Sequence, residues 1–192
     1  MLGGTRTPCV LSIDTSGILG GVAIACGGRL LAELRCDARA AASERILPQI
    51  THVLSDLGLT FGDVDRIGVA VGPGSFTGLR VGLATAKGLA QSLGCPVAPI
   101  SSLTARAHWL EVSGRPILVA AAHRRGVLFS SAGIFTDAGW TELLGEASRS
   151  ITEAHEWVSE AFEAAVTGGS AGAGQTGIVT GGSAGAGQTG IV

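Results

Sequence analysis

Two short stretches of the chain combine glycines with hydroxyl and carboxyl groups, a composition that suits phosphate chemistry. The first is Asp14-Thr15-Ser16-Gly17. At a β-turn, backbone N–H groups and the two hydroxyls can hold a phosphate, while the carboxylate binds magnesium through water. An Asx-type turn that closes a hairpin uses the same residue types, and spacing alone favours this simpler interpretation.

The second stretch, Gly-Pro-Gly-Ser-Phe-Thr-Gly at 72–78, lies between an apolar run and a helix-like run. Gly72 and Gly74 free the backbone at a strand exit, and Ser75 or Thr77 can cap the following helix, whose exposed N–H groups attract anions. A phosphate site is one interpretation. The other is a tight turn that caps a helix packed very close to a neighbouring element.

The helix that follows this loop carries two faces suited to burial. Gly78, Gly82 and Ala86 recur at intervals of four and form a smooth strip, beside a stripe of larger apolar residues. An amphipathic helix that only covers a core needs one such face. The small-residue strip therefore predicts a close helix contact, either within the fold or with a partner.

Other catalytic motifs are incomplete. The tail contains Gly-Ala-Gly-Gln-Thr-Gly at 172–177, which fits a dinucleotide fingerprint, but no convincing helix follows it. The overlapping likeness to a phosphate loop lacks its lysine, because the only lysine of the chain is Lys87. His-Glu-Trp-Val-Ser at 155–159 lacks the second histidine of a zinc protease, and no serine-nucleophile elbow is present. We therefore expect neither a metal site nor a catalytic triad.

The elements that must position the two stretches alternate in type. Apolar runs separated by turn residues predict a three-stranded meander and then helices and strands in alternation, which is typical of an α/β fold with parallel strands. Strands are predicted at 10–13, 21–25, 30–34, 66–72 and 95–100, with two more within 115–135, and helices at 43–57, 79–93, 102–112 and 150–166. Ser43 and a Ser150/Glu153 capping box are the predicted starts of two helices, and Gly94 ends a third.

Three regions follow from this pattern. Residues 1–113 form a first lobe, and residues 114–166 form a reduced second lobe. The tail, 167–192, is rich in glycine, alanine and serine, and the segment 166–178 recurs identically at 179–191. Such a repeat of small residues has little to bury, so we expect the tail to be disordered.

Charge and hydropathy limit the partners. The 13 basic and 15 acidic residues give a net charge of −2, which offers no basic surface for gripping nucleic acid. Charged residues make up only 15% and the mean hydropathy is +0.44, so part of the apolar surface is expected to face another protein. The chain shows no membrane span and no signal core, which predicts a cytoplasmic protein. The four cysteines are scattered and are expected to be reduced.

Three motifs, in this order and spacing, closely resemble the TsaB (YeaZ) family of bacterial proteins. They are Leu-Ser-Ile-Asp-Thr-Ser-Gly at 11–17, Ser-Glu-Arg-Ile-Leu-Pro at 43–48, and the long run from Val69 to Ala90. The resemblance covers about Val10 to Phe135. It implies an actin-like ATPase superfamily (ribonuclease H-like) fold with two lobes, of which the second is reduced. The chain departs from the family pattern at Ala42, Ala122 and Val127.

The resemblance also implies a role in tRNA modification. Family members are non-catalytic partners of the TsaD subunit, which transfers a threonylcarbamoyl group to the adenosine beside the anticodon of ANN-decoding tRNAs. The ATPase TsaE joins the complex, and a homodimer is an alternative assembly. The resemblance implies that this chain has no cofactor of its own, that ATP or ADP and magnesium belong to the partner subunits or the complex interface, and that tRNA is reached through the complex.

In the family, the two helices around the second and third motifs form the contact surface. The resemblance therefore implies a partner interface at Ser43, Glu44, Ile46, Leu47, Gly78, Arg80, Gly82 and Leu83. The alternative is an actin-fold phosphotransferase, similar to a sugar or acetate kinase, with ATP between Asp14 and the Gly72 loop. A peptidase interpretation ranks last because the chain offers no nucleophile or metal set.

Overall fold

The computed structural model describes residues 7–37, 42–110, 114–124, 126–168 and 177–181. The chain divides into two units, Met1–Ser102 (unit 1) and Leu103–Val192 (unit 2). The sequence pattern places this boundary at residue 113. The chain divides earlier because Leu103 and Ala107, which follow Ser102, are fully buried in a core with the first strand of unit 2.

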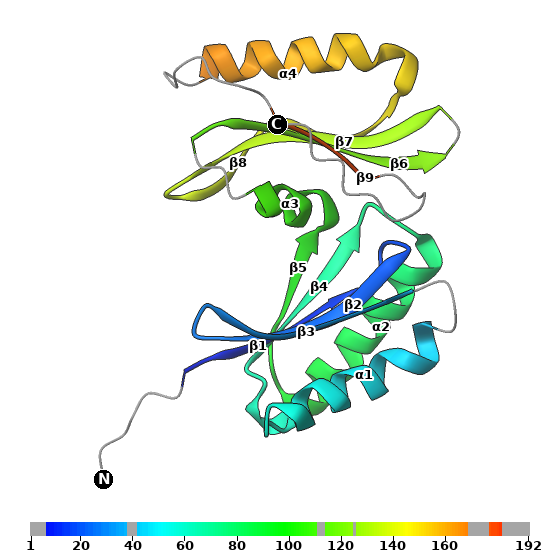
Figure 1. Ribbon diagram of the computed structural model, residues 1–192, viewed down its shortest axis with the longest axis vertical. Helices are drawn as coiled ribbons and strands as arrows, with labels where there is room; N and C mark the ends of the chain where they lie inside the picture. The colour runs from blue at the N-terminus through cyan, green and yellow to red at the C-terminus, as the bar shows by residue number, and fades with distance from the viewer. Residues whose placement is uncertain (1–6, 38–41, 111–113, 125, 169–176, 182–192) are drawn as a thin grey trace. The chain divides into compact units, whose positions relative to one another are not determined.

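Unit 1 is a five-stranded sheet with two helices on one face (Figure 1). Its strand order is β3-β2-β1-β4-β5, with the first three strands antiparallel and β4 and β5 parallel to β1. Its elements are β1 (Cys9–Asp14), β2 (Leu19–Cys26), β3 (Arg29–Asp37), α1 (Ala42–Asp56), β4 (Arg66–Gly72), α2 (Phe76–Leu93) and β5 (Val97–Ser101). This arrangement confirms the predicted α/β fold.

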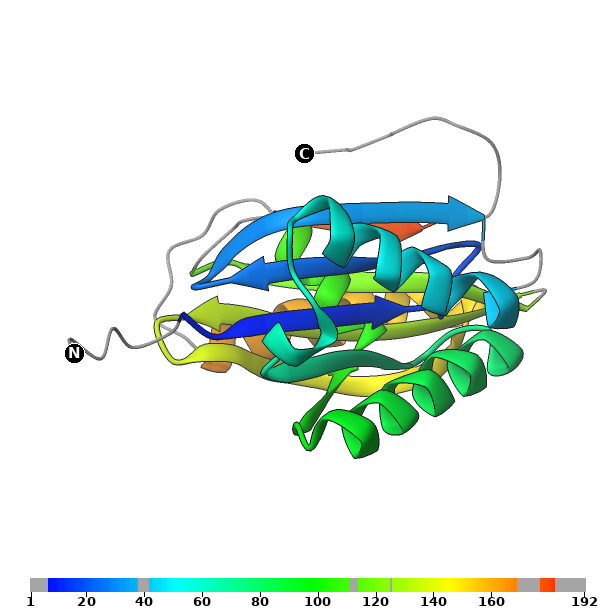
Figure 2. The same ribbon diagram turned by 90° about the horizontal axis from the view of Figure 1, so that it is seen from below.

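The core of unit 1 lies between the sheet and the two helices. Alternate strand residues point to the helix face, as the two-residue period of a strand requires, and apolar residues of α1 and α2 close over them. The buried residues are Leu11, Ile13, Val22, Ile24, Ile67 and Val69 from the strands, with Ile46, Ile50, Val53, Leu54 and Ala86 from the helices. Figure 2 shows α1 and α2 side by side across the sheet.

Local sequence signals fix the ends of α2. The side chain of Ser75 accepts a hydrogen bond from the Gly78 N–H, so Ser75 is the N-cap, as one of the two predicted alternatives stated. Gly94 ends the helix with φ 67°, a left-handed conformation that glycine adopts without steric cost. Ser43 was predicted as the cap of α1. That prediction is wrong, because α1 begins at Ala42 and Ser43 lies inside its first turn.

Unit 2 is a four-stranded sheet of order β8-β7-β6-β9, in which β9 runs parallel to β6 and the other pairs are antiparallel. Its two faces are covered by different helices: Ile117 and Val119 pack with α3, whereas Leu118 and Ala120 pack with α4. The elements are α3 (Ser102–Ala107), β6 (Pro116–Arg124), β7 (Val127–Thr136), β8 (Gly139–Ser150), α4 (Ala154–Gly168) and β9 (Gly177–Gly181).

The elements of this region differ from the predicted ones in two ways. The helix predicted at 102–112 is shorter, since α3 ends at Ala107 and a 3-10 turn follows at His108–Leu110. The strand β8 has no counterpart among the strands predicted from the sequence. The Ser150 hydroxyl accepts a hydrogen bond from the Thr152 N–H at 3.2 Å and so caps the 3-10 turn at Ile151–Glu153 that precedes α4, as predicted for the serine of the Ser150/Glu153 pair.

The tail, predicted to be disordered, contains a strand. Residues 177–181 form β9, and their backbone pairs in register with Ile117–Ala121 of β6. The sequence Gly-Ile-Val-Thr-Gly offers three consecutive β-branched residues, which favour strands. Residues 167 and 168 belong to the end of α4. The remaining parts of the repeat, 169–176 and 182–192, lie outside the described residues.

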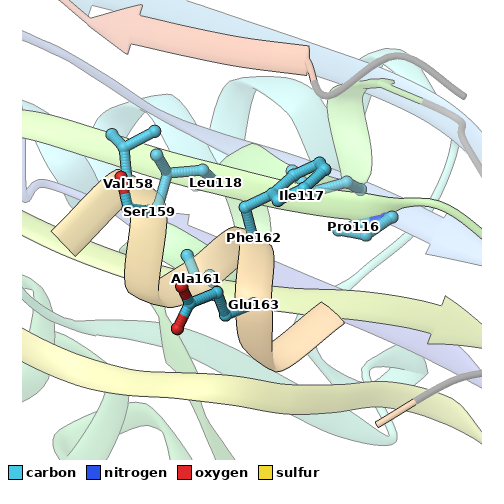
Figure 3. A pocket seen from close by; sticks show the side chains of 9 residues that line it. Pro116, Ile117, Leu118, Val158, Ser159, Ala161, Phe162 and Glu163 are labelled. Atoms are coloured by element: carbon cyan, nitrogen blue, oxygen red, sulfur yellow. The ribbon is translucent and has the colours of Figure 1, made fainter. Parts of the chain in front are cut away.

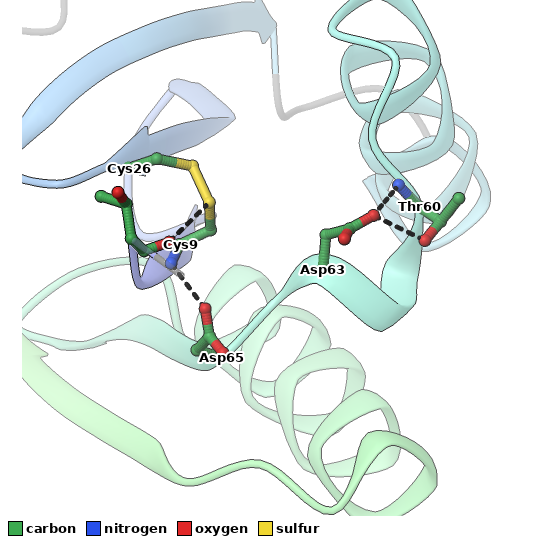
Figure 4. Close-up of a disulfide and its surroundings, with 6 residues drawn as sticks. Cys9, Cys26, Thr60, Asp63 and Asp65 are labelled. Atoms are coloured by element: carbon green, nitrogen blue, oxygen red, sulfur yellow. Dashed lines mark hydrogen bonds between the residues drawn. A yellow bond between two sulfur atoms is a disulfide. The ribbon is translucent and has the colours of Figure 1, made fainter. Parts of the chain in front are cut away.

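A disulfide joins the first two strands of unit 1 (Figure 4). Cys9 and Cys26 face each other in the β1–β2 register, with their Cα atoms 4.1 Å apart. The expectation that all four cysteines are reduced is therefore wrong for this pair, whereas Cys36 and Cys95 are free thiols. Asp65 holds the same end of β1: the Cys9 N–H donates to its carboxylate at 2.7 Å.

Candidate functional site

The two glycine and hydroxyl stretches meet at one edge of the unit 1 sheet. Asp14 is the last residue of β1 and Gly72 is the last residue of β4. These strands are parallel neighbours, with Ile13 opposite Val69. Because the carboxyl ends of parallel strands lie at the same edge, the Asp14 turn and the glycine loop come together there, where open α/β sheets commonly bind ligands.

Hydrogen bonds interlock the two stretches. The Thr15 hydroxyl donates to the Gly78 carbonyl at 2.7 Å, and the Ser75 N–H donates to the Ser16 carbonyl at 2.7 Å. Within the turn, the Ser16 N–H donates to an Asp14 carboxylate oxygen at 2.8 Å, the geometry of an Asx turn. The turn and the start of α2 therefore satisfy each other's polar groups.

Glycines, which have no side chain, allow the Thr15–Ser16 turn and α2 to lie this close together. A Cβ atom at position 74 would lie 2.7 Å from Ser16 Cβ and would also meet the Ser16 carbonyl oxygen. At position 78 it would meet the carbonyl oxygen of Thr15, and at position 82 it would meet the Thr15 hydroxyl. The small-residue strip of α2 therefore makes its close contact within unit 1, against the Thr15–Ser16 turn.

This arrangement uses several of the groups that could otherwise bind a phosphate. The N–H groups of Ser16 and Ser75 are used inside the protein, and Thr15 and Ser16 are only 4% and 3% exposed. The Ser16 hydroxyl has no hydrogen-bond partner in the structure, but it is buried. Asp14 and Thr77 are exposed. Among the described residues, no group of three or more histidine, cysteine or acidic side chains could hold a metal ion.

The residues predicted to contact a partner divide into buried and exposed sets. Ile46 is 3% exposed and Leu83 packs against the core, so both support the helices of unit 1. Gly78 and Gly82 face the Thr15 turn, as described above. A larger residue at position 82 would therefore perturb unit 1 itself and would not test partner binding cleanly.

The exposed set lies on α1 and at the start of α2. Glu44 and Arg80 are exposed, and Leu47 is 46% exposed although it is apolar. Phe76, which the sequence pattern does not single out as a contact residue, is 73% exposed, and the Arg80 guanidinium lies 5.5 Å from the centre of its ring. An aromatic residue at the first position of a helix, among glycines and hydroxyls, was the signal that could have indicated it.

The fold and this site define the class of the protein. A three-stranded meander followed by a helix and a parallel strand occurs in both units, and it is the ribonuclease H-like architecture of the actin-like ATPase superfamily. Two solved structures from Pseudomonas aeruginosa share it. YeaZ is 26% identical with a TM-score of 0.66, covering 73% of this chain and 67% of that chain. An uncharacterized protein with similarity to peptidase YEAZ has a TM-score of 0.68 at 26% identity, covering 74% of this chain and 67% of that chain.

Sequence comparisons identify the family. A family model described as TsaD, tRNA N6-adenosine threonylcarbamoyltransferase, matches residues 37–168. Proteins named tRNA threonylcarbamoyladenosine biosynthesis protein TsaB are similar: that of Haemophilus influenzae is 51% identical over 65 residues, that of Bacillus subtilis 38% over 94, and that of Escherichia coli 31% over 122. The chain belongs to the TsaB (YeaZ) family, and the TsaD family model also matches its sequence.

The matches are partial in length. They cover 34%, 49% and 62% of this chain, and 28%, 41% and 52% of the three relatives in the same order. The chain therefore spans about half or less of the length of these curated relatives. Separately, no helix in the described part of the chain has both the length and the apolar character needed to cross a membrane.

Proposed function

We propose that this chain is a non-catalytic subunit in the synthesis of N6-threonylcarbamoyladenosine on the adenosine beside the anticodon of ANN-decoding tRNAs. In this proposal the chain binds a TsaD catalytic subunit in the cytoplasm, TsaE joins the assembly, and a homodimer is the competing state. The net charge of −2 supports access to tRNA through the complex, because the chain has no excess of basic residues for direct binding.

One observation carries the non-catalytic part of the proposal. The residues that would cradle a phosphate are bonded to each other: Thr15 to the Gly78 carbonyl, and the Ser75 N–H to the Ser16 carbonyl. An anion site at a helix N-terminus needs N–H groups that point at the ligand. Here one such N–H group points into the protein, which supports a structural use of the loop.

The exposed part of α1 and α2 supports the contact surface. Leu47 and Phe76 are large apolar side chains left in solvent, and Arg80 lies beside the Phe76 ring. Interfaces are enriched in aromatic and arginine anchors, and such anchors carry much of the binding free energy. We assign Leu47, Phe76 and Arg80, with Glu44 at the edge, to the TsaD contact.

Co-expression with the TsaD subunit of the same organism tests this assignment. A Leu47→Asp/Phe76→Asp variant should lose co-purification and tRNA modification, while circular dichroism shows an intact fold. The matched control is Ile151→Asp, an exposed apolar residue of unit 2 that is 54% exposed. Retained co-purification of the double variant, or equal loss in the control, would remove the assignment.

Nucleotide binding separates this proposal from the phosphotransferase alternative. The isolated chain should neither bind nor hydrolyse ATP in the presence of magnesium, and it should not phosphorylate sugars or acetate. Binding that is lost in Asp14→Asn would show that the interlocked loops open to admit a nucleotide, and the non-catalytic assignment would then be withdrawn.

A further inference from the structure

The first turn of α2, residues 76–79, follows a loop that favours no fixed backbone. Gly72, Gly74 and Gly78 lie within seven residues of sequence, and glycine loses more conformational freedom on folding than any other residue. The first N–H groups of a helix also have no partner within the helix. Contacts from outside α2 are therefore needed to hold its start.

The Thr15–Ser16 turn supplies such contacts on both sides of Phe76. The Ser75 N–H, one residue before Phe76, donates to the Ser16 carbonyl at 2.7 Å. The Thr15 hydroxyl donates at 2.7 Å to the carbonyl of Gly78, two residues after Phe76. Phe76 therefore lies in a short span of backbone that is fixed at both ends by bonds to another part of the unit.

Thr15 itself is too buried to contact a partner. Its side chain belongs to a residue that is 4% exposed, and its hydroxyl is used in the bond to Gly78. An added Cβ at Gly82 would also meet this hydroxyl, so the Thr15 side chain lies directly against α2. Any effect of Thr15 on partner binding must therefore pass through the residues that it holds.

The backbone, and not side-chain packing, sets the position of the Phe76 ring. Phe76 is 73% exposed, and the Arg80 guanidinium lies 5.5 Å from the centre of its ring. Residues four apart lie on the same side of a helix, so this pair keeps its geometry only while the first turn stays helical. The order of the exposed ring therefore depends on the bonds from the Thr15–Ser16 turn.

An exposed phenylalanine in unit 2 shows the contrasting case. Phe162 lies inside α4 and is 56% exposed. It lines a groove of about 380 Å³ together with Ile117 and Leu118 of β6, so it lies against its own sheet (Figure 3). Phe162 is therefore a matched control for Phe76: an exposed aromatic residue of a helix whose position does not depend on the Thr15–Ser16 turn.

A side chain that is already in place binds at lower cost. Association normally removes freedom from side chains and loops at the interface, and a residue that is fixed beforehand avoids part of that loss. Aromatic residues are also enriched among those that carry most of the binding free energy. A fixed and exposed Phe76 is therefore suited to act as an anchor.

We propose that Thr15 is a positioning residue for partner binding: its buried hydroxyl holds the first turn of α2 and so presents the Phe76 ring to the partner. The inference rests on the proposed function, in which Phe76 belongs to the TsaD contact. It goes beyond that function because it assigns a part in recognition to a residue that the partner does not touch.

Amide hydrogen exchange in the isolated chain tests whether Thr15 holds the turn. The Leu79 N–H donates to the Ser75 carbonyl at 2.8 Å, so its exchange reports the opening of the first turn. Thr15→Val keeps the side-chain shape and removes the hydroxyl. The Leu79 amide should then exchange roughly fivefold faster, which corresponds to the loss of one hydrogen bond. Thr15→Ser, which keeps the hydroxyl, should restore the wild-type rate.

Ile67→Val controls for a general loss of stability. Ile67 is fully buried near the start of β4, whereas the first turn of α2 follows the end of that strand. The small cavity left by Ile67→Val should lower the urea midpoint about as much as Thr15→Val does, without opening the first turn. Equal acceleration of Leu79 exchange in the two variants would mean that the turn opens only with the whole unit, and would overturn the proposal.

Affinity for the TsaD subunit of the same organism tests the consequence for recognition. Thr15→Val should bind roughly fivefold more weakly than the wild type, and Thr15→Ser should bind like the wild type. Ile67→Val and Phe162→Ala should both leave the affinity unchanged.

Two double-mutant cycles show through which residue Thr15 acts. In the Phe76→Ala background, Thr15→Val should lose most of its effect on affinity, because the anchor that it positions is gone. In the Leu47→Ala background the full effect should remain, because Leu47 lies on α1.

The outcomes separate this inference from the contact on which it rests. If Phe76→Ala binds more weakly but Thr15→Val binds like the wild type, the inference is overturned and the TsaD contact stands. The same holds if Thr15→Val has an equal effect in the two backgrounds. Wild-type affinity of Phe76→Ala would overturn the contact assignment itself, and the inference with it.

Discussion

The interlock between the Thr15 turn and α2 predicts opposite effects for two identical substitutions in one helix. At Gly78, an added Cβ would meet the Thr15 carbonyl oxygen and would lie 3.2 Å from the Thr15 carbonyl carbon. At Gly88, further along the same helix, an added Cβ has no neighbour within 4 Å. The Gly78→Ala and Gly88→Ala variants therefore differ only in what the new methyl group touches.

The expected change in the free energy of unfolding follows from the known costs of overpacking and of losing a hydrogen bond. Overpacking against backbone costs about 1–3 kcal/mol. Loss of the hydrogen bond from Thr15 adds about 1 kcal/mol, and the better helix propensity of alanine returns at most about 1 kcal/mol. Gly78→Ala should therefore destabilise unit 1 by about 1–3 kcal/mol, which lowers the melting temperature by roughly 4–24 °C for a unit of this size. Gly88→Ala should stabilise it by up to about 1 kcal/mol.

The assay must report on unit 1. The three tryptophans, Trp109, Trp140 and Trp157, all lie in unit 2, so fluorescence follows that unit, whereas far-UV circular dichroism follows both. Hydrogen exchange of the β1 and β4 amides isolates unit 1. If Gly78→Ala is as stable as the wild type, or more stable than Gly88→Ala, the close contact that defines the site does not exist.

Three further substitutions or treatments test other contacts. Reduction of the Cys9–Cys26 disulfide, which spans 17 residues, should cost about 3 kcal/mol in thermal unfolding, and four free thiols without reductant would refute the bond. Thr15→Val keeps the side-chain shape but removes the donor to the helix backbone, and should cost about 1 kcal/mol in urea unfolding; an unchanged midpoint would contradict the hydrogen bond. Gly133→Val would collide with the Trp140 indole and should lower the free energy of unfolding, followed by fluorescence, by about 1–3 kcal/mol, whereas an unchanged value would mean that the indole lies elsewhere.

The sequence predicted the elements that carry strong local signals. The strand at 66–72 was predicted with its exact bounds, because an apolar run ends there at glycine. The end of α2 followed from Gly94, whereas its start remained open between Ser75 and Thr77 as caps, with the helix itself predicted only from Leu79. The strand β8 was missed because it is an edge strand with most of its residues exposed, so it shows neither an apolar run nor a clear two-residue alternation.

Contacts between residues far apart in the chain could not be predicted from the sequence to the same extent. Parallel strand order could suggest that the Asp14 turn and the glycine loop share an edge, but only the structure pairs Thr15 with Gly78, 63 residues away. The disulfide likewise depends on the β1–β2 register, which spacing alone does not give. For the partner surface, helical periodicity does not distinguish a face buried in its own unit from one available to another protein, and Ile46 and Leu47 are adjacent residues on opposite sides of that division.

The positions 74 and 78 show why absent side chains can be restrictive. The close packing of the two loops requires glycine at both positions, so a protein that has no phosphate chemistry would still need these glycines to keep its fold. A search that sorts proteins by such a signature will therefore group turnover-competent enzymes with inert subunits. Only the atoms that face the opposite loop can tell the two apart.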